Sequence, residues 1–150
     1  MDETTIRAAR PDDVPAIVAM LADDPLGATR ERPDDLAPYR RAFAAVDADP
    51  NQHLVVADLG GRVVGTLQFA VIPGLARCGA PRGQIEAVRV HAAHRGRGIG
   101  AALVQWAIGQ GRRRGCALVQ LTSDASRTDA HRFYRRLGFA PTHTGFRLAL

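Results

Sequence analysis

Residues 84–101, which read QIEAVRVHAAHRGRGIGA, constrain the fold more than any other part of the chain. An apolar segment runs into a loop of arginines and glycines, and the loop leads directly into a helical pattern. A helix start carries unpaired backbone N–H groups and a partial positive charge, which together favour a bound phosphate. Glycines let a bulky anion approach the main chain, and arginines add charge. The expected anion-binding residues are Arg95, Gly96, Arg97, Gly98, Ile99, Gly100 and Ala101.

The composition is that of an ordinary globular protein of 150 residues, long enough to form one domain over residues 1–150 without disulfide or metal staples. All basic residues are arginine, and the net charge is +5. This charge suits a polyanionic ligand, but acids are interleaved with the arginines, unlike in a nucleic-acid-binding arm. Cys78 and Cys116 are too few for a zinc site or a disulfide framework, so no metal is expected.

The acidic N-terminal residues do not fit a targeting peptide, and the uncharged runs are too short to span a membrane. We therefore expect a soluble cytoplasmic protein.

The apolar periodicities predict an alternation of strands and helices. Strands are expected at 4–9, 53–59, 62–72, 82–91 and 116–122, and one or two more within 139–150; helices are expected from Pro11, and at 35–46, 98–114 and 127–137. The order β-α-α-β-β-β-α-β-α-β-β indicates an α/β fold, a mixed central sheet with helices on both faces. Residues 84–122 form a β-α-β unit whose two strands should be parallel, with a right-handed crossover.

Two familiar phosphate-binding motifs fit the loop poorly. A Walker P-loop needs a lysine, and the chain has none. Residues 96–101 satisfy the letters of the dinucleotide-binding fingerprint, with Asp124 further on. That fingerprint normally opens a domain built from two mononucleotide-binding halves, whereas here it begins two-thirds along the chain and leaves too little sequence for the second half.

Two separate segments resemble the GCN5-related N-acetyltransferase (GNAT) superfamily. Arg95-x-x-Gly98-x-Gly100 resembles its Q/R-x-x-G-x-G/A signature, and residues 85–90 are similar to its fourth strand. Downstream, residues 130–139 resemble its A-x-x-F-Y-x-x-x-G-F segment. The element order follows that of the superfamily from end to end, so the chain resembles its small, single-domain, bacterial-type members.

The resemblance implies transfer of an acetyl group from acetyl-CoA to an amine within a ternary complex. Backbone amides of residues 97–101 are then expected to wrap the CoA pyrophosphate, and main-chain groups of Val88 and Val90 to bond the pantetheine arm in the slot between two splayed strands. Phe133 belongs to the same cofactor site. Tyr134 takes the position of the general acid that protonates the leaving sulfur, and Glu86 that of a base acting through water.

Each catalytic role has a structural alternative. Tyr134 also belongs to an apolar stripe and could serve only in core packing. Glu86 interrupts an apolar strand, which is costly unless it is solvated, functional or paired with Arg82 or Arg89. Many relatives carry Asn where this chain has Arg127, so a cofactor contact inferred from that Asn does not carry over.

The acceptor is left open as an amine of a small molecule or peptide. The acids of residues 23–35 either attract a cationic amine or form a solvated surface. A non-catalytic acyl-CoA-binding sensor and a basic nucleic-acid-binding module are the alternative functions, and the second lacks interleaved aromatic residues. By analogy with the superfamily, a homodimer through the C-terminal strands is expected.

Overall fold

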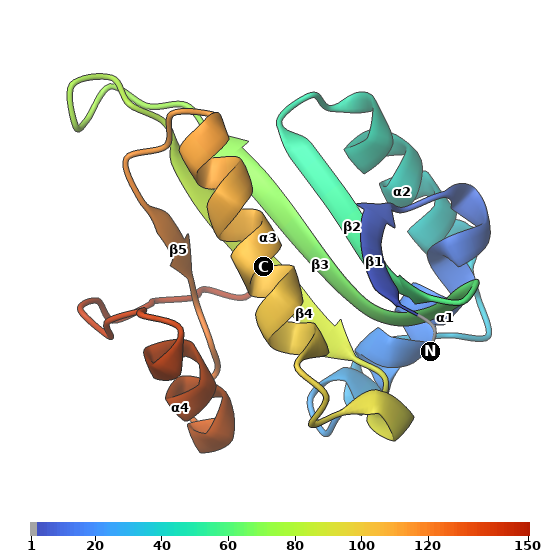
Figure 1. The fold of residues 1–150 in the computed structure, drawn as a ribbon. Helices are drawn as coiled ribbons and strands as arrows, with labels where there is room; N and C mark the ends of the chain where they lie inside the picture. The colour runs from blue at the N-terminus through green and yellow to red at the C-terminus, as the bar shows by residue number, and fades with distance from the viewer. Residues whose placement is uncertain (1–2) are drawn as a thin grey trace.

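The computed structural model describes residues 3–150 as a five-stranded mixed sheet with helices on both of its faces (Figure 1). The strands and α-helices are β1 (Thr4–Ala8), α1 (Val14–Ala22), α2 (Ala37–Ala48), β2 (Gln52–Leu59), β3 (Arg62–Ile72), β4 (Arg82–Val90), α3 (Ile99–Arg113), β5 (Val119–Leu121) and α4 (Thr128–Arg136). Short 3-10 helices lie at Pro11–Asp13, Gly27–Thr29 and Ala92–His94.

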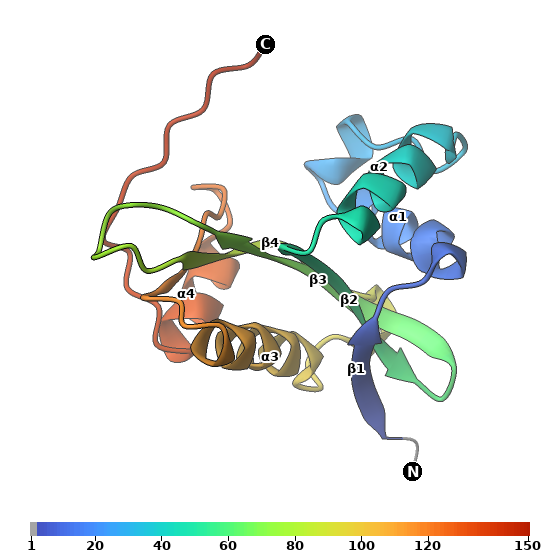
Figure 2. The ribbon, with the colours of Figure 1, turned by 90° about the horizontal axis from the view of Figure 1, so that it is seen from above.

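The strands follow one another across the sheet in chain order, β1-β2-β3-β4-β5. Neighbours from β1 to β4 are antiparallel, and β4 pairs with β5 in parallel, as the β-α-β unit predicts. Figure 2 shows α1 and α2 above the sheet and α3 and α4 below it. The expected α/β fold class, with helices on both faces, is confirmed.

The hydrophobic core lies between the sheet and α3. Alternate residues of a strand point to opposite faces, and the apolar stripe of α3 covers one of those faces. The buried residues of this hydrophobic core are Val55, Ala57, Val64, Leu67, Phe69, Ile85, Ile99, Leu103, Val104 and Ala107. Ile99 and Leu103 belong to this hydrophobic core. The core therefore holds the first two turns of α3, which directly follow the glycine loop.

Most expected elements are present within one or two residues of the expected ends. The hairpin of β2 and β3 turns at Gly60-Gly61, and α3 is followed by Gly115, a left-handed glycine with φ 74°. The strand expected at 116–122 is shorter, because β5 covers only Val119–Leu121.

The C-terminal strands expected within residues 139–150 are not formed. This segment leaves the body of the molecule as an extended chain (Figure 2), and its apolar side chains Phe146 and Leu148 are 93% and 86% exposed. It touches the sheet near the end of β5, where the Arg147 guanidinium donates to Thr122 Oγ1 (3.3 Å). A strand needs an edge to pair with, and three-residue β5 offers too short a template for a ladder.

Candidate functional site

The arginine–glycine loop has the backbone geometry that an anion site at a helix start requires. Gly96 and Gly98 adopt φ 77° and 79°, which is left-handed backbone that L side chains rarely adopt. The first helical bond of α3 runs from Ala102 N–H to the Gly98 carbonyl (3.0 Å). The N–H groups of residues 99–101 therefore have no acceptor within the helix, and a Cβ at Gly96 or Gly98 would meet no atom within 4 Å. The residues present fit a bound phosphate.

Gly100 connects this loop with the second motif. A Cβ at Gly100 would lie 3.4 Å from Phe133 Cζ and 3.6 Å from Val90 Cγ2, so the aromatic ring of α4 packs against the helix start and the end of β4. The two segments that resemble the superfamily are therefore in contact in the fold.

β4 and β5 pair only from Gly83–Val119 to Ile85–Leu121, so the ladder between them ends before Val88 and Val90. His91 donates its N–H to the Val64 carbonyl of β3 (2.8 Å), so Val88 and Val90, on the alternate positions, direct their main-chain groups away from β3, toward the edge of β4 that β5 leaves unpaired. Arginine side chains donate hydrogen bonds to the backbone carbonyls of both valines. Arg89 donates to the Val88 carbonyl (2.9 Å), and Arg95 donates to the Val90 carbonyl (3.2 Å). The N–H groups remain for a ligand along this edge.

Tyr134 lies on α4 among aromatic rings. Its ring packs edge-on against Phe133 and Phe139, with centroids 5.1 and 5.9 Å away. Burial raises the pKa of Tyr134, and the positive charges of Arg89 and Arg127 offset part of that rise. The phenol is thus protonated at neutral pH and able to donate a proton.

A β-bulge brings Glu86 and Arg89 to the same face of the sheet. Thr66 pairs with Arg89 and Gln68 with Glu86, so two residues of β4 oppose one residue of β3. Ala87 within the bulge has φ 53°, unusual for a residue other than glycine. Glu86 is exposed and makes no ion pair among residues 3–150, so the alternative of a pair with Arg82 or Arg89 is not realised.

Arg89 pairs instead with Asp24, in the loop after α1. One carboxylate oxygen of Asp24 lies 3.0 Å from Arg89 Nε and accepts from Arg127 Nη2 at 2.7 Å, and the other accepts from the N–H of Gly27. Burial opposes the charge of Asp24, but the hydrogen bonds from Gly27 and Arg127 outweigh it and lower the pKa of the carboxyl. Sequence analysis missed this Asp24–Arg89–Arg127 cluster, because nothing in the chain links residues so far apart.

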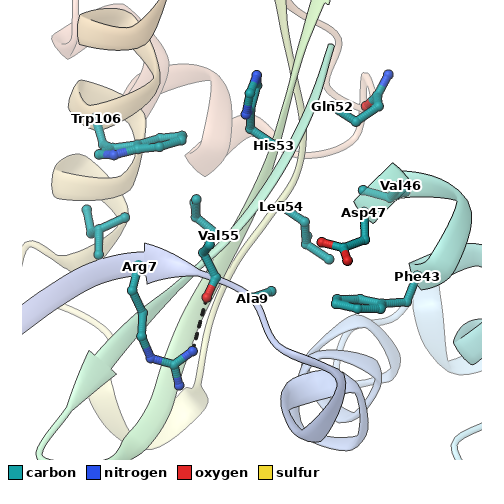
Figure 3. Close-up of a pocket in the computed structure, with 12 residues that line it drawn as sticks. Arg7, Ala9, Phe43, Val46, Asp47, Gln52, His53, Leu54, Val55 and Trp106 are labelled. Carbon is teal, nitrogen blue, oxygen red and sulfur yellow. Dashed lines mark hydrogen bonds between the residues drawn. The ribbon is translucent and has the colours of Figure 1, made fainter. Parts of the chain in front are cut away.

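Two of the pockets in the described part of the chain lie against the sheet. The larger, about 260 Å³, lies where β1 and β2 meet α2 and α3; Figure 3 shows Trp106 and His53 on one side and Phe43 on the other. None of the expected site residues lines it. The smaller, about 120 Å³, lies between α1, α2 and the sheet and reaches Gln68 and Ala87, beside Glu86.

Across residues 3–150, no group of His, Cys, Asp and Glu side chains is arranged to hold a metal ion. No helix in the same residues is long and apolar enough to cross a bilayer.

The comparisons with known proteins agree with this geometry. The profile of the acetyltransferase (GNAT) family matches residues 15–139. An aminoalkylphosphonate N-acetyltransferase from Salmonella typhimurium is 32% identical over 145 residues, which cover 97% of this chain and 90% of that protein.

Two of the solved structures that are similar over nearly their whole lengths share more than 30% of their residues with this chain. One is described as a transcriptional regulator from Bacillus halodurans, with 46% identity and a TM-score of 0.96 over 99% of this chain and 100% of that one. The other is a putative acetyltransferase from Agrobacterium tumefaciens, with 31% identity and a TM-score of 0.85 over 97% and 99%.

The mixed sheet, the splayed parallel strands and the glycine loop at a helix start define the fold of N-acetyltransferases. The chain belongs to the acetyltransferase (GNAT) family and is an acetyltransferase.

Proposed function

We propose that residues 1–150 form one acetyltransferase domain that transfers the acetyl group of acetyl-CoA to a primary amine, by direct attack in a ternary complex. The observation that carries the proposal is the contact between the glycine loop and the Phe133–Tyr134 segment. The left-handed glycine loop at the start of α3 contacts Phe133, and the adjacent Tyr134 lies half-buried at the same end of β4.

The cofactor residues act through their main chain. The N–H groups of Gly98, Ile99, Gly100 and Ala101 bind the pyrophosphate, with charge from Arg95 and Arg97, both exposed at the loop. The N–H groups of Val88 and Val90 bond the pantetheine arm as an added strand bonds a sheet edge. Acetyl-CoA supplies the activated acyl group, and no metal takes part.

Glu86 and Tyr134 move the protons. The Glu86 carboxylate, which is exposed and makes no ion pair of its own among residues 3–150, accepts a proton from the ammonium of the acceptor through water. The Tyr134 hydroxyl donates a proton to the leaving sulfur. A backbone N–H group of β4, the strand that carries Val88, stabilises the oxyanion of the tetrahedral intermediate.

Family membership and the curated N-acetyltransferase relative favour this reaction over an acyl-CoA sensor and over a nucleic-acid-binding module. The name of that relative makes aminoalkylphosphonates the first acceptors to test. The assay monitors free thiol released from acetyl-CoA over a panel of amines, with mass spectrometry of the products. Acetylated amine formed in step with thiol supports the proposal. Acetyl-CoA binding with no turnover of any amine in the panel favours the sensor.

We also propose a cytoplasmic homodimer held through residues 140–150. Apolar Phe146, Leu148 and Leu150 alternate along this extended segment and are almost fully exposed, which a partner strand would relieve. Light scattering after size exclusion tests the dimer. Removing residues 144–150 is expected to give a monomer, and a full-length chain that runs as a monomer at all concentrations contradicts the proposal.

A further inference from the structure

The Asp24–Arg89–Arg127 cluster joins three separate parts of the fold beside the catalytic groups. Arg89 belongs to β4, Arg127 immediately precedes α4, and Asp24 lies in the loop after α1. Arg89 and Arg127 both lie close enough to Tyr134 for their charges to act on its phenol. The cluster is therefore part of the same site as the proposed acid.

Asp24 has no capacity left to bind an ammonium group. One of its oxygens accepts from Gly27, and the other contacts both arginines, at 2.7 and 3.0 Å. Two guanidinium groups share one carboxylate, so the cluster carries a net positive charge. Asp24 is therefore not available to attract a cationic amine, as the sequence alone allowed for the acids of residues 23–35.

Arg89 has hydrogen-bonding capacity to spare. Its side chain is only 14% exposed, and its buried Nε–H has no hydrogen-bond acceptor, although Asp24 lies 3.0 Å away, because the N–H does not point at the carboxylate. Burial, only partly compensated by Asp24, lowers the pKa of this guanidinium. A buried donor without an acceptor is costly, and this one is too enclosed for a ligand to reach. An oxyanion would instead contact the Arg127 guanidinium, whose side chain is 31% exposed, and would be attracted by the net positive charge of the cluster.

The bulge at Ala87 places Arg89 on the face of β4 that carries Glu86. A molecule whose amine lies near Glu86 can thus present an anionic group to the arginines. The small pocket beside Glu86, lined mainly by apolar side chains of α1 and α2, suits the short alkyl part of such a molecule.

We propose that Arg89 and Arg127, oriented by Asp24, bind the anionic group of the acceptor, so that the preferred substrate is a compact amine bearing a phosphonate or similar oxyanion. This inference rests on the proposed N-acetyltransferase function and names its acceptor class.

The first test measures kcat/KM for 2-aminoethylphosphonate, for β-alanine and for propylamine, which lacks an anion. The wild type is expected to favour the phosphonate over propylamine by about 10- to 100-fold, because charge-assisted hydrogen bonds are lost with propylamine. β-Alanine shows whether a carboxylate replaces the phosphonate. Arg127→Gln should reduce the preference for the phosphonate about tenfold, through KM. Arg135→Gln, an exposed change on α4, the helix that Arg127 precedes, should retain it.

A second test needs no turnover. Calorimetry with methylphosphonate, on protein saturated with CoA so that the pyrophosphate loop is filled, should show binding by the wild type and about tenfold weaker binding by Arg127→Gln. Equal treatment of 2-aminoethylphosphonate and propylamine by the wild type, or equal methylphosphonate binding by both proteins, overturns the inference and leaves the acetyltransferase proposal standing. Failure to bind CoA overturns the proposed function itself. A CoA affinity of Arg127→Gln close to that of the wild type shows that the variant is folded.

Discussion

Replacing Gly98 by alanine changes the anion loop through the backbone alone. Gly98 has φ 79°, and an added Cβ would meet no atom within 4 Å, so the substitution introduces no steric overlap. A left-handed L residue costs about 1–2 kcal/mol. This cost appears either as lower folding stability, if the loop keeps its shape, or as weaker acetyl-CoA binding, if the loop relaxes. The two losses together should equal about 1–2 kcal/mol, and 1.4 kcal/mol in affinity is a tenfold rise in Kd.

Urea unfolding and calorimetry with acetyl-CoA measure the two parts separately. Gly109→Ala is the matched control, because Gly109 lies in the middle of α3 and its added Cβ would have only ordinary contacts, the nearest at 3.6 Å with Arg113. Alanine is the better helix former, so this variant should gain about 0.8 kcal/mol of stability. The reasoning fails if Gly98→Ala loses neither stability nor affinity, or if the two substitutions change stability in the same direction.

The remaining predictions concern the proton-transfer groups and one structural ion pair. Tyr134→Phe keeps the packing and removes the proton, so kcat should fall about 100-fold or more while acetyl-CoA still binds; unchanged turnover contradicts the acid role. Glu86→Gln should lower the rate similarly, and a variant with the wild-type rate shows that Glu86 is not the base. Asp13→Asn breaks the pair with Arg7 (2.8 Å) and should lower the free energy of unfolding by about 2 kcal/mol near pH 7. Because the hydrogen bond from Arg7 lowers the folded pKa of Asp13, the stabilisation is complete above about pH 4 and is lost as pH falls through the folded pKa; an Asn variant whose deficit persists at low pH contradicts this origin.

The sequence was most informative where local patterns determine local structure. The β2–β3 hairpin, the strand before the glycine loop and the start of α3 depend on alternation, turn residues and apolar spacing, which are visible in short windows. The glycine loop could be interpreted as an anion site because left-handed backbone at a helix start has few sequence solutions.

Features that depend on distant contacts were not predictable. The cluster at Asp24 joins residues that only the folded sheet brings together. The bulge has alanine rather than glycine at its positive φ, so no residue type marks it, yet it decides that Glu86 and Arg89 share a face.

In the C-terminal segment, by contrast, a local sequence pattern predicted strands that the structure does not form. Residues 144–150 alternate as a strand does, and this pattern predicts strands regardless of whether an edge exists to receive them. Since β5 ends at Leu121, the chain offers that segment almost no edge of its own.

The most direct test of the central claim is a calorimetric titration of the wild-type protein with acetyl-CoA. The account predicts one binding event per chain with a micromolar dissociation constant, unchanged by Gly109→Ala and weakened by Gly98→Ala to the extent that its cost is not already lost from folding stability. No heat of binding at micromolar to millimolar acetyl-CoA, from a protein shown to be folded, would contradict the assignment of the loop as the cofactor site and the acetyl-CoA-dependent reaction proposed for this chain.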